Sequence, residues 1–86
     1  MIWRVEWTHE AVKDMRRLDR KTRARVLRAI GRLAATGQGD VSSLKPPLED
    51  RRLRVGEWRV RFAYAADTDT IHILHVKPRS EAYRMG

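Results

Sequence analysis

The chain has 86 residues, no cysteine and a formal net charge of +8, with 19 Lys and Arg residues against 11 Asp and Glu residues. This length predicts one domain over residues 1–86, and the missing cysteines exclude disulfides and thiolate metal sites. No segment approaches the ~20 apolar residues of a membrane span, and the first residues lack the apolar core of a signal peptide. We therefore expect a soluble cytoplasmic protein with no membrane partner. Most of the basic residues are Arg, which favours a nucleic-acid partner over a merely solvated basic surface.

The first part of the chain predicts a strand followed by a helix. Apolar and charged residues alternate over residues 2–7, which is typical of a half-buried strand. The apolar set on one face is Trp3, Val5 and Trp7. Thr8 has the side chain and the position of a helix N-cap. The helix that follows carries apolar residues at helical spacing, namely Ala11, Val12, Met15 and Leu18.

A second helix is predicted over residues 20–36. Asp19 can cap its start, and Gly37 fits the position just past its end. Its apolar stripe consists of Val26, Leu27, Ile30, Leu33 and Ala34, and the opposite side carries Arg25, Arg28 and Arg32. Because the two helices are adjacent in the sequence, we expect a helical hairpin.

Residues 37–50 are predicted as a loop. The Pro46-Pro47 pair cannot continue a helix or a strand. Leu44 and Leu48 are the residues expected to anchor this loop to the core.

The rest of the chain predicts three strands. A β-hairpin covers residues 51–62, its second strand continues through Tyr64, and a last strand follows over residues 70–76 after a turn at 67–69. The predicted order is β-α-α-β-β-β. This is an α+β fold with an antiparallel sheet and an N-terminal helical hairpin packed on one face.

The hairpin RRLRVGEWRVRF sets arginine opposite arginine. Its Gly56-Glu57 loop fits a type II′ turn, which fixes the register of the two strands. Because side chains alternate, the core face receives Leu53, Val55, Trp58, Val60, Phe62 and Tyr64. The other face receives two cross-strand pairs, Arg52 with Arg61 and Arg54 with Arg59. Such like-charge pairs repel, so we expect either acidic neighbours such as Glu49, Glu57 or Glu81, or a bound phosphate backbone.

Residues beyond the last strand can complete a site for RNA cleavage on this face. Attack of an RNA 2′-hydroxyl on the adjacent phosphate needs a base, an acid and cations. The arginines can supply the cations, and Lys77, Arg79 and Tyr83 follow the strand closely enough to reach the same face. A tyrosine there can stack on an unpaired base.

The three histidines are interpreted as structural. His72 and His75 are three positions apart on one strand, so we expect them to point to opposite faces. His9 lies at a helix start. No cluster of His, Asp and Glu has the spacing of metal ligands, so no metal and no other cofactor is predicted.

Two motifs together resemble the RelE/ParE superfamily of bacterial and archaeal toxins, particularly the RelE branch. They are the run LRVGEWRVRF and the C-terminal pattern basic-x-R-S-E-x-Y, here KPRSEAY. The helical stretch AVKDMRRLDRKTRARVLRAI and the order of elements are also similar to this family. The resemblance implies a RelE-like fold and a metal-independent, ribosome-dependent endoribonuclease that cuts mRNA in the ribosomal A site. It also implies a RelB-like antitoxin, expected to be acidic and partly disordered, through which alone operator DNA would be bound.

The resemblance assigns site residues one by one. The implied catalytic set is Arg52, Arg54, Arg59, Lys77, Arg79 and Tyr83. Within it, Arg59 matches the arginine that stabilises the transition state, and Lys77 matches the position of the general acid. Further RNA contacts are expected from Lys13, Arg17, Lys45, Arg51, Arg61 and Arg84. For Arg25, Arg28 and Arg32, contact with ribosomal RNA and simple solvation are both open.

Two positions depart from the family pattern. The pair before the turn is lysine in the best-known member, where it is linked to base catalysis, whereas Arg52 and Arg54 are poor general bases. Conversely, Lys77 replaces an arginine and gives up a proton more readily. We therefore expect a slower mechanism dominated by positioning and electrostatics. The alternatives are a ParE-like toxin that acts on DNA gyrase without nuclease activity, and a degenerate toxin that only binds its antitoxin.

Overall fold

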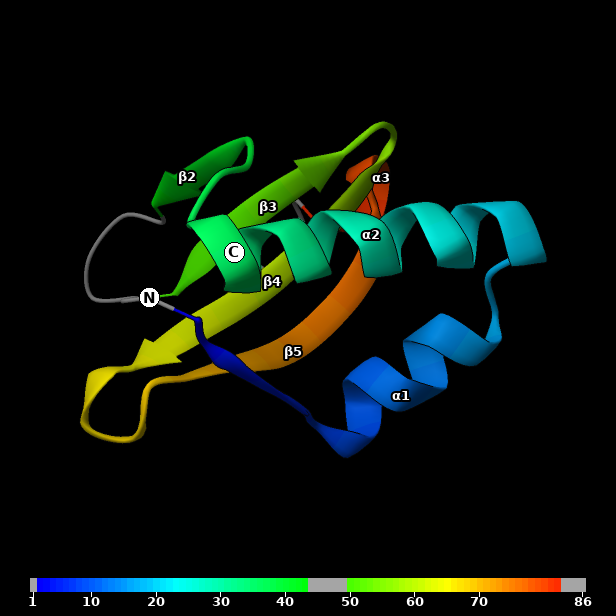
Figure 1. Ribbon diagram of the computed structural model, residues 1–86. Helices are drawn as coiled ribbons and strands as arrows, with labels where there is room; N and C mark the ends of the chain where they lie inside the picture. The colour runs from blue at the N-terminus through cyan, green and yellow to red at the C-terminus, as the bar shows by residue number, and fades with distance from the viewer. Residues whose placement is uncertain (1, 44–49, 83–86) are drawn as a thin grey trace.

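The computed structural model describes residues 2–43 and 50–82, whose arrangement is shown in Figure 1. In chain order the elements are β1 (Arg4–Trp7), α1 (His9–Arg16), α2 (Arg20–Thr36), β2 (Val41–Ser43), β3 (Arg51–Val55), β4 (Trp58–Ala65), the 3₁₀ helix η1 (Ala66–Thr68), β5 (Thr70–Pro78) and α3 (Arg79–Ala82). The α+β class and the predicted elements are confirmed, and β2 and α3 are additions. The predicted anchors Leu44 and Leu48 lie outside the described residues. No helix in the described ranges is long and apolar enough to cross a membrane.

The five strands form one sheet in the order β1-β5-β4-β3-β2. The predicted antiparallel pairing is confirmed from β2 to β5. β1 departs from it because it runs parallel to β5, with Trp7 opposite Ile73. A parallel pair needs a long crossover connection, and the whole chain between β1 and β5 serves as that connection.

The predicted loop at 37–50 contains a short strand. β2 pairs antiparallel with β3, with Val41 opposite Leu53. The prediction of a continuous loop is therefore wrong at Val41–Ser43. A strand of three residues is too short to show the alternation on which sequence-based recognition depends.

Both predicted helix starts are confirmed. The hydroxyl of Thr8 accepts the backbone N–H of Ala11 at 3.1 Å. The carboxylate of Asp19 accepts the N–H of Thr22 at 3.4 Å. α2 ends at Thr36 and is capped by Gly37, which has a left-handed φ of +74°. These caps depend on neighbouring residues alone, which is why the sequence predicts them.

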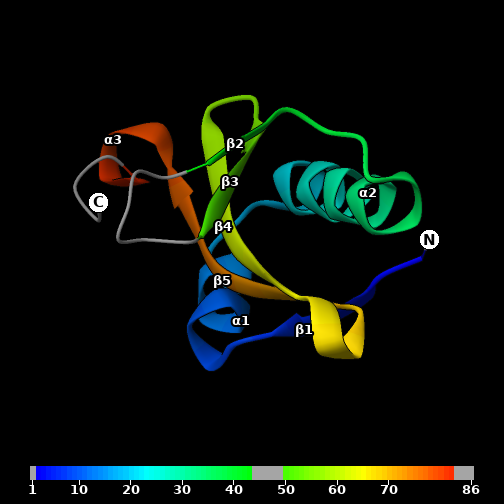
Figure 2. The same ribbon diagram turned by 90° about the vertical axis from the view of Figure 1, so that its left-hand side faces the viewer.

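The core lies between α2 and one face of the sheet. Figure 2 shows α2 on one side of the sheet and α3 on the other, while α1 packs against β5. The largest fully buried side chains are Val26, Leu33, Leu53, Val60, Phe62, Ile71, Ile73 and Val76. Two members of the predicted apolar stripes, Val12 and Leu27, are exposed instead. With Trp7 and Met15 they line an apolar pocket of about 420 Å³.

Tyr64 closes one end of the core. It shares the core face as predicted, opposite Ile71, but it is 36% exposed. Its ring centre lies 4.9 Å from that of Trp3 and 5.3 Å from that of Phe62. Tyr64 therefore covers core side chains and is not itself buried among them.

A β-bulge in β5 changes the placement of two histidines. The register between β4 and β5 shifts between Arg61 and Phe62, so that Arg61 faces His75 while Ala63 faces His72. Arg61 and Ala63 share one face of β4, and both histidines therefore lie on that face. The prediction that they point to opposite faces is wrong, because it assumes an unbroken alternation along the strand.

Candidate functional site

Basic residues gather on the face of the sheet that α2 leaves uncovered. The predicted hairpin register is confirmed. Gly56 has the positive φ, +60°, that a type II′ turn requires at its first position. Two rows of residues cross β3, β4 and β5. The first row is Arg54, Arg59 and Lys77, and the second is Arg52, Arg61 and His75. We call these two rows the basic face.

A pocket of about 210 Å³ opens on the basic face. Its lining residues are Asp40, Ser42, Arg52, Arg54 and Arg59. Three guanidinium groups against one carboxylate leave the pocket positively charged. Guanidinium and hydroxyl groups are also the hydrogen-bond donors that suit a phosphate.

Arg59 is held in place within this pocket. The residue is 7% exposed, and its Nη1 donates to the carbonyl oxygens of Gly56 and Trp58 at 2.8 and 2.9 Å. Within residues 2–43 and 50–82, no carboxylate lies within 4.0 Å of its guanidinium. A buried cation without a counter-charge is costly. It is also a preorganised site for an anion.

Two aspartates partly neutralise other arginines of the basic face. Arg61 Nε lies 2.8 Å from Asp50 Oδ2, and both side chains are less than one-quarter exposed. Arg54 Nε lies 4.0 Å from Asp40 Oδ2, but these side chains are 61% and 70% exposed. Solvent screens the second pair, so Asp40 neutralises little of the positive charge of Arg54.

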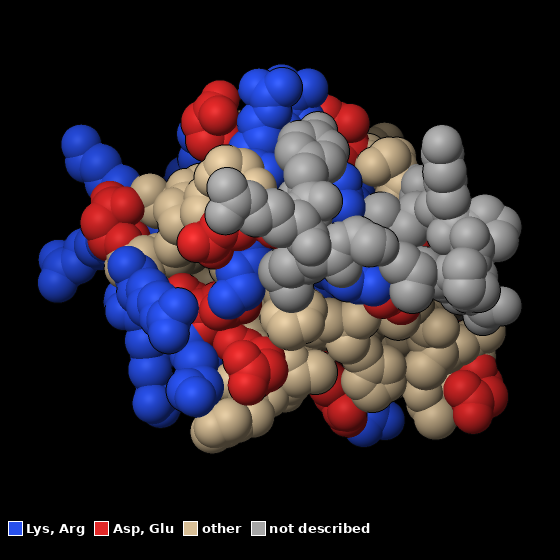
Figure 3. Space-filling view, turned by 180° about the vertical axis from the view of Figure 1, so that it is seen from behind, with Lys and Arg blue, Asp and Glu red and all other residues tan. Residues whose placement is uncertain are grey.

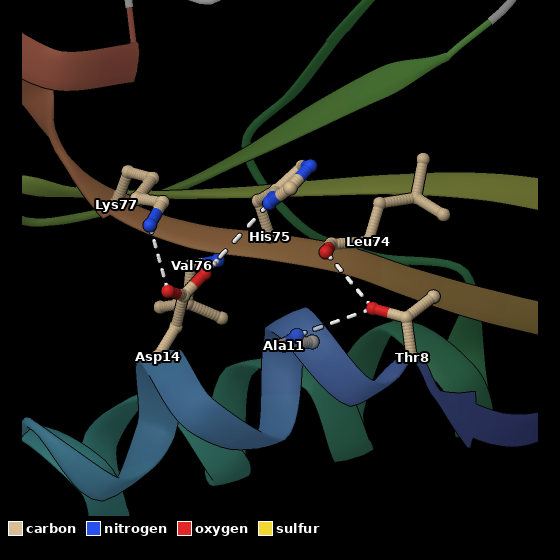
Figure 4. A network of polar contacts seen from close by, with 7 residues as sticks. All are labelled: Thr8, Ala11, Asp14, Leu74, His75, Val76 and Lys77. Carbon is tan, nitrogen blue, oxygen red and sulfur yellow. Dashed lines mark hydrogen bonds and ion pairs between the residues drawn. The ribbon is translucent and has the colours of Figure 1, made fainter.

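Lys77 makes an ion pair that the sequence analysis does not predict. Its Nζ lies 2.7 Å from Asp14 Oδ1, and Asp14 Oδ2 accepts the backbone N–H of Val76 at 2.9 Å. Figure 4 shows this carboxylate reaching from α1 to β5. The Asp14 side chain is only 3% exposed. One sequence signal was available: Asp14 lies three residues after Ala11 and four before Leu18, and so falls on the apolar side of its helix.

The two histidines of β5 lie beside different carboxylates. His75 Nδ1 is 3.9 Å from Asp14 Oδ2 and is buried without a hydrogen-bond partner in the described structure. His72 Nδ1 is 3.9 Å from Glu6 Oε2. They therefore do not form one acid–base pair. Among the residues described, no three His, Cys, Asp or Glu side chains are grouped so that they could hold a metal ion.

Arg79 lies next to the turn of the hairpin. It begins α3, and its backbone N–H donates to the carbonyl oxygen of Glu57 at 2.8 Å. This contact brings the predicted catalytic residue to the end of the basic face. Glu57 and Glu81, expected as partners of the hairpin arginines, form no ion pair in the described part of the chain.

Several predicted RNA contacts are not brought to the basic face. Arg51 faces Phe62 in the register, on the core side of the sheet, and its guanidinium lies 5.5 Å from the ring centre of Tyr64. Lys13 and Arg17 are exposed at α1. The role of all three stays a prediction. Four predicted residues lie outside the described ranges, namely Lys45, Glu49, Tyr83 and Arg84.

The arginines of α2 lie apart from the basic face. Arg25 packs over the hairpin turn, since a Cβ added to Gly56 would come within 2.8 Å of its Nη1. Arg32 donates to the side chain of Gln38 at 3.2 Å. A further pocket of about 490 Å³ is lined by Arg20, Lys21, Thr22, Ala24, Arg25 and Arg28. In Figure 3, which views the molecule from behind, Lys and Arg side chains form separate groups with acidic side chains between them.

Comparison with known proteins identifies a family and several similar structures. A model of the ParE toxin of type II toxin–antitoxin systems (parDE) matches residues 5–83. The chain is 25% identical to a chain of the toxin–antitoxin complex RelBE2 from Mycobacterium tuberculosis, with a TM-score of 0.80 over 92% of this chain and 100% of that chain. It is 27% identical to a chain of the archaeal RelE–RelB complex from Pyrococcus horikoshii, with a TM-score of 0.75 over 92% and 97%. A mutant of the E. coli toxin RelE in the free state, 16% identical with a TM-score of 0.73 over 98% and 90%, supports the fold alone. No curated protein matches the chain.

Proposed function

The chain belongs to the ParE toxin family of type II toxin–antitoxin systems, and we propose that it is a toxin that cleaves mRNA. The proposed activity is a metal-independent endoribonuclease that acts in the A site of the ribosome and thereby inhibits translation. The basic face supports a function of the RelE type, and so does the similarity to the RelBE2 and RelE–RelB structures.

The observation that carries the proposal is the buried, preorganised guanidinium of Arg59. It lines a pocket together with Arg52 and Arg54, and it faces Lys77 on the next strand. A phosphodiester placed there would supply the counter-charge that Arg59 lacks within the described structure. Fixed cations aimed at a phosphate stabilise the extra negative charge that develops in the transition state.

In the proposed reaction, the 2′-oxygen of one nucleotide attacks the adjacent phosphorus. The bond from phosphorus to the 5′-oxygen of the next nucleotide breaks, leaving a 2′,3′-cyclic phosphate and a 5′-hydroxyl. Arg59, supported by Arg52 and Arg54, stabilises the charged transition state. Lys77 donates the proton that the leaving 5′-oxygen takes up. Because arginine is a poor base, the 2′-hydroxyl proton passes to solvent, and positioning carries most of the catalysis.

The proposal includes an antitoxin as the partner of this chain. The RelBE2 and RelE–RelB structures to which it is similar are complexes of a toxin with an antitoxin. A net charge of +8 favours an acidic partner by electrostatic complementarity. Operator DNA would be bound only through that partner.

Mapping the 5′ ends of transcripts tests the proposed cleavage. The toxin is expressed briefly in cells, and the purified protein is added to programmed ribosomes. We expect cuts within translated codons that leave 5′-hydroxyl ends, and no cuts in naked mRNA. A folded protein that leaves ribosome-bound transcripts intact would contradict the proposal.

A second candidate function is ParE-like action on DNA gyrase. It is favoured by one observation, that the matching family model is itself a ParE model. This function predicts DNA damage that depends on gyrase, in cells whose transcripts stay uncut. If neither damage nor cuts appear while antitoxin binding is intact, the toxin is degenerate.

A further inference from the structure

The contact between α1 and β5 adds a residue to the candidate site. We propose that Asp14 is a positioning residue that fixes the ammonium group of Lys77 in the row Arg54–Arg59–Lys77. The inference rests on the proposed function in one respect, namely that Lys77 takes part in cleavage. Asp14 acts through Lys77 and needs no contact with RNA, because its side chain is only 3% exposed.

A lysine needs such a partner if it is to act at one point in space. Its ammonium group sits on a flexible four-carbon stem, and a free side chain would sample many positions. Lys77 Nζ instead lies 2.7 Å from Asp14 Oδ1, and its side chain is 19% exposed. A displacement of about 1 Å can cost a reaction about 100-fold in rate, so this restraint bears directly on the proposed proton transfer.

The carboxylate of Asp14 is itself oriented by the strand that carries Lys77. Its Oδ2 accepts the backbone N–H of Val76 at 2.9 Å. With that oxygen fixed, Oδ1 is directed at Lys77 (Figure 4). His75 is a weaker candidate for the same oxygen atoms, because its Nδ1 lies 3.9 Å away. Lys77 is therefore the side chain that this carboxylate holds.

A purely structural role for Asp14 is the alternative. β1 pairs with β5 as far as Ile73, and beyond that point α1 supplies partners to the strand edge. Thr8 donates its hydroxyl to the carbonyl oxygen of Leu74 at 2.9 Å, and Asp14 accepts from Val76. A structural role at the edge of β5 needs only Asp14 Oδ2, which accepts the Val76 N–H. It needs neither Oδ1 nor the negative charge of the carboxylate.

Asp14→Asn separates the two roles. The amide oxygen can still accept the hydrogen bond from the Val76 N–H, but the amide nitrogen is a donor and cannot accept the hydrogen bond from the Lys77 ammonium group. Thr8→Ala is the control for a structural loss at this edge, because it removes both the N-cap of α1 and the contact with Leu74 while it leaves both carboxylate oxygens of Asp14 in place. The readouts are the 15N signal of the Lys77 ammonium in the full chain, assigned with Lys77→Arg, and single-turnover cleavage on ribosomes.

We expect the Lys77 ammonium protons to exchange slowly in the wild type and in Thr8→Ala, and rapidly in Asp14→Asn. Cleavage by Asp14→Asn should fall about 10- to 100-fold with unchanged ribosome affinity. The double variant with Lys77→Met should be no slower than Lys77→Met alone. Wild-type Lys77 protons that exchange as fast as those of exposed Lys13 and Lys21 would overturn the proposal, as would wild-type cleavage by folded Asp14→Asn.

The two proposals fail in different ways. If the wild-type chain cuts no mRNA, the proposed function falls, while the ammonium signal still decides whether Asp14 holds Lys77. If Asp14→Asn does not fold, the exchange rate of the Lys77 ammonium protons in the wild type alone decides whether Asp14 holds Lys77.

Discussion

Burial separates Arg59 from the other arginines of the basic face. Arg61 is paired with Asp50, and Arg54 is exposed to solvent. The guanidinium of Arg59 is instead fixed by two backbone carbonyls. Both carbonyls belong to the hairpin turn and the residue after it, so the turn that sets the strand register also orients the cation. Catalytic stabilisation depends on groups that need no rearrangement during the reaction, and Arg59 meets this condition.

Replacing Arg59 tests this difference. Arg59→Ala should lower single-turnover cleavage on ribosomes by about 100-fold or more, the usual loss for a preorganised group that stabilises charge. Lys21→Ala is the control, since Lys21 is an exposed cation at the start of α2 with no assigned role, and it should cleave like the wild type. Equal losses for both variants would indicate a general effect of charge instead.

Asp19 gives the fold a defined pH response. Hydrogen bonds from Thr22, first from its side chain and then from its backbone, hold the pKa of Asp19 below its usual value. A carboxyl group with a lowered folded pKa stabilises the protein above its unfolded pKa, and this contribution is lost as the pH falls through the folded pKa. Asp19→Asn should therefore lower the urea midpoint at pH 7, and the difference should shrink below about pH 3.9, the usual pKa of Asp. A difference that stays constant down to acid pH would contradict this assignment.

At the scale of elements, local signals predict the fold better than contacts between distant segments. Thr8 and Asp19 cap helices where expected, and Gly56 fixes the hairpin, because each acts on residues next to it in the chain. β2 has only three residues, and the bulge in β5 depends on how that strand meets β4. The pair of Asp14 with Lys77 spans 63 positions. No local pattern encodes such a contact.

The same substitution, Gly→Ala, should have opposite effects on stability in α2 and in the hairpin turn. Gly31 lies inside α2, where an added Cβ would meet nothing within 4 Å. Gly31→Ala should therefore stabilise the protein by about 0.5–1 kcal/mol. Gly56 has φ +60° and lies against Arg25, so Gly56→Ala should destabilise it by about 1–2 kcal/mol. Urea unfolding measures both, and a stabilising Gly56→Ala would show that the turn is not of the expected type.

For the whole molecule, the excess of basic residues governs how it meets its partners. A net charge of +8 attracts polyanions from a distance, and salt screens this attraction. This property can be predicted from the sequence, because net charge follows from the residue counts alone. Which arginines of the basic face lie beside Asp40 and Asp50 cannot be predicted in this way, because it depends on where those two carboxylates lie in the fold.

The salt dependence of RNA affinity should distinguish the exposed Arg54 from Arg61, which is paired with Asp50. Each phosphate contact to a single strand contributes about 0.7 to the slope of log affinity against log salt. Arg54→Ala should therefore reduce the slope for single-stranded RNA binding by about 0.7. Arg61→Ala should change it less, because Asp50 already pairs with Arg61 at 2.8 Å. Equal changes in a filter-binding titration would mean that this ion pair opens when RNA binds.

The parallel pairing of β1 with β5 determines when the sheet and its basic face can be completed during folding. β1 is synthesised first among the described elements, and it pairs with the last described strand, Thr70–Pro78. Until that strand emerges, neither β1 nor α1 has its place on the sheet, and the Asp14–Lys77 contact cannot form. Strands that are far apart in the sequence pair slowly, because the chain between them loses conformational entropy before the stabilising contacts form. The row Arg54–Arg59–Lys77 and the Asp14–Lys77 contact are therefore complete only after almost all of the described chain has been synthesised.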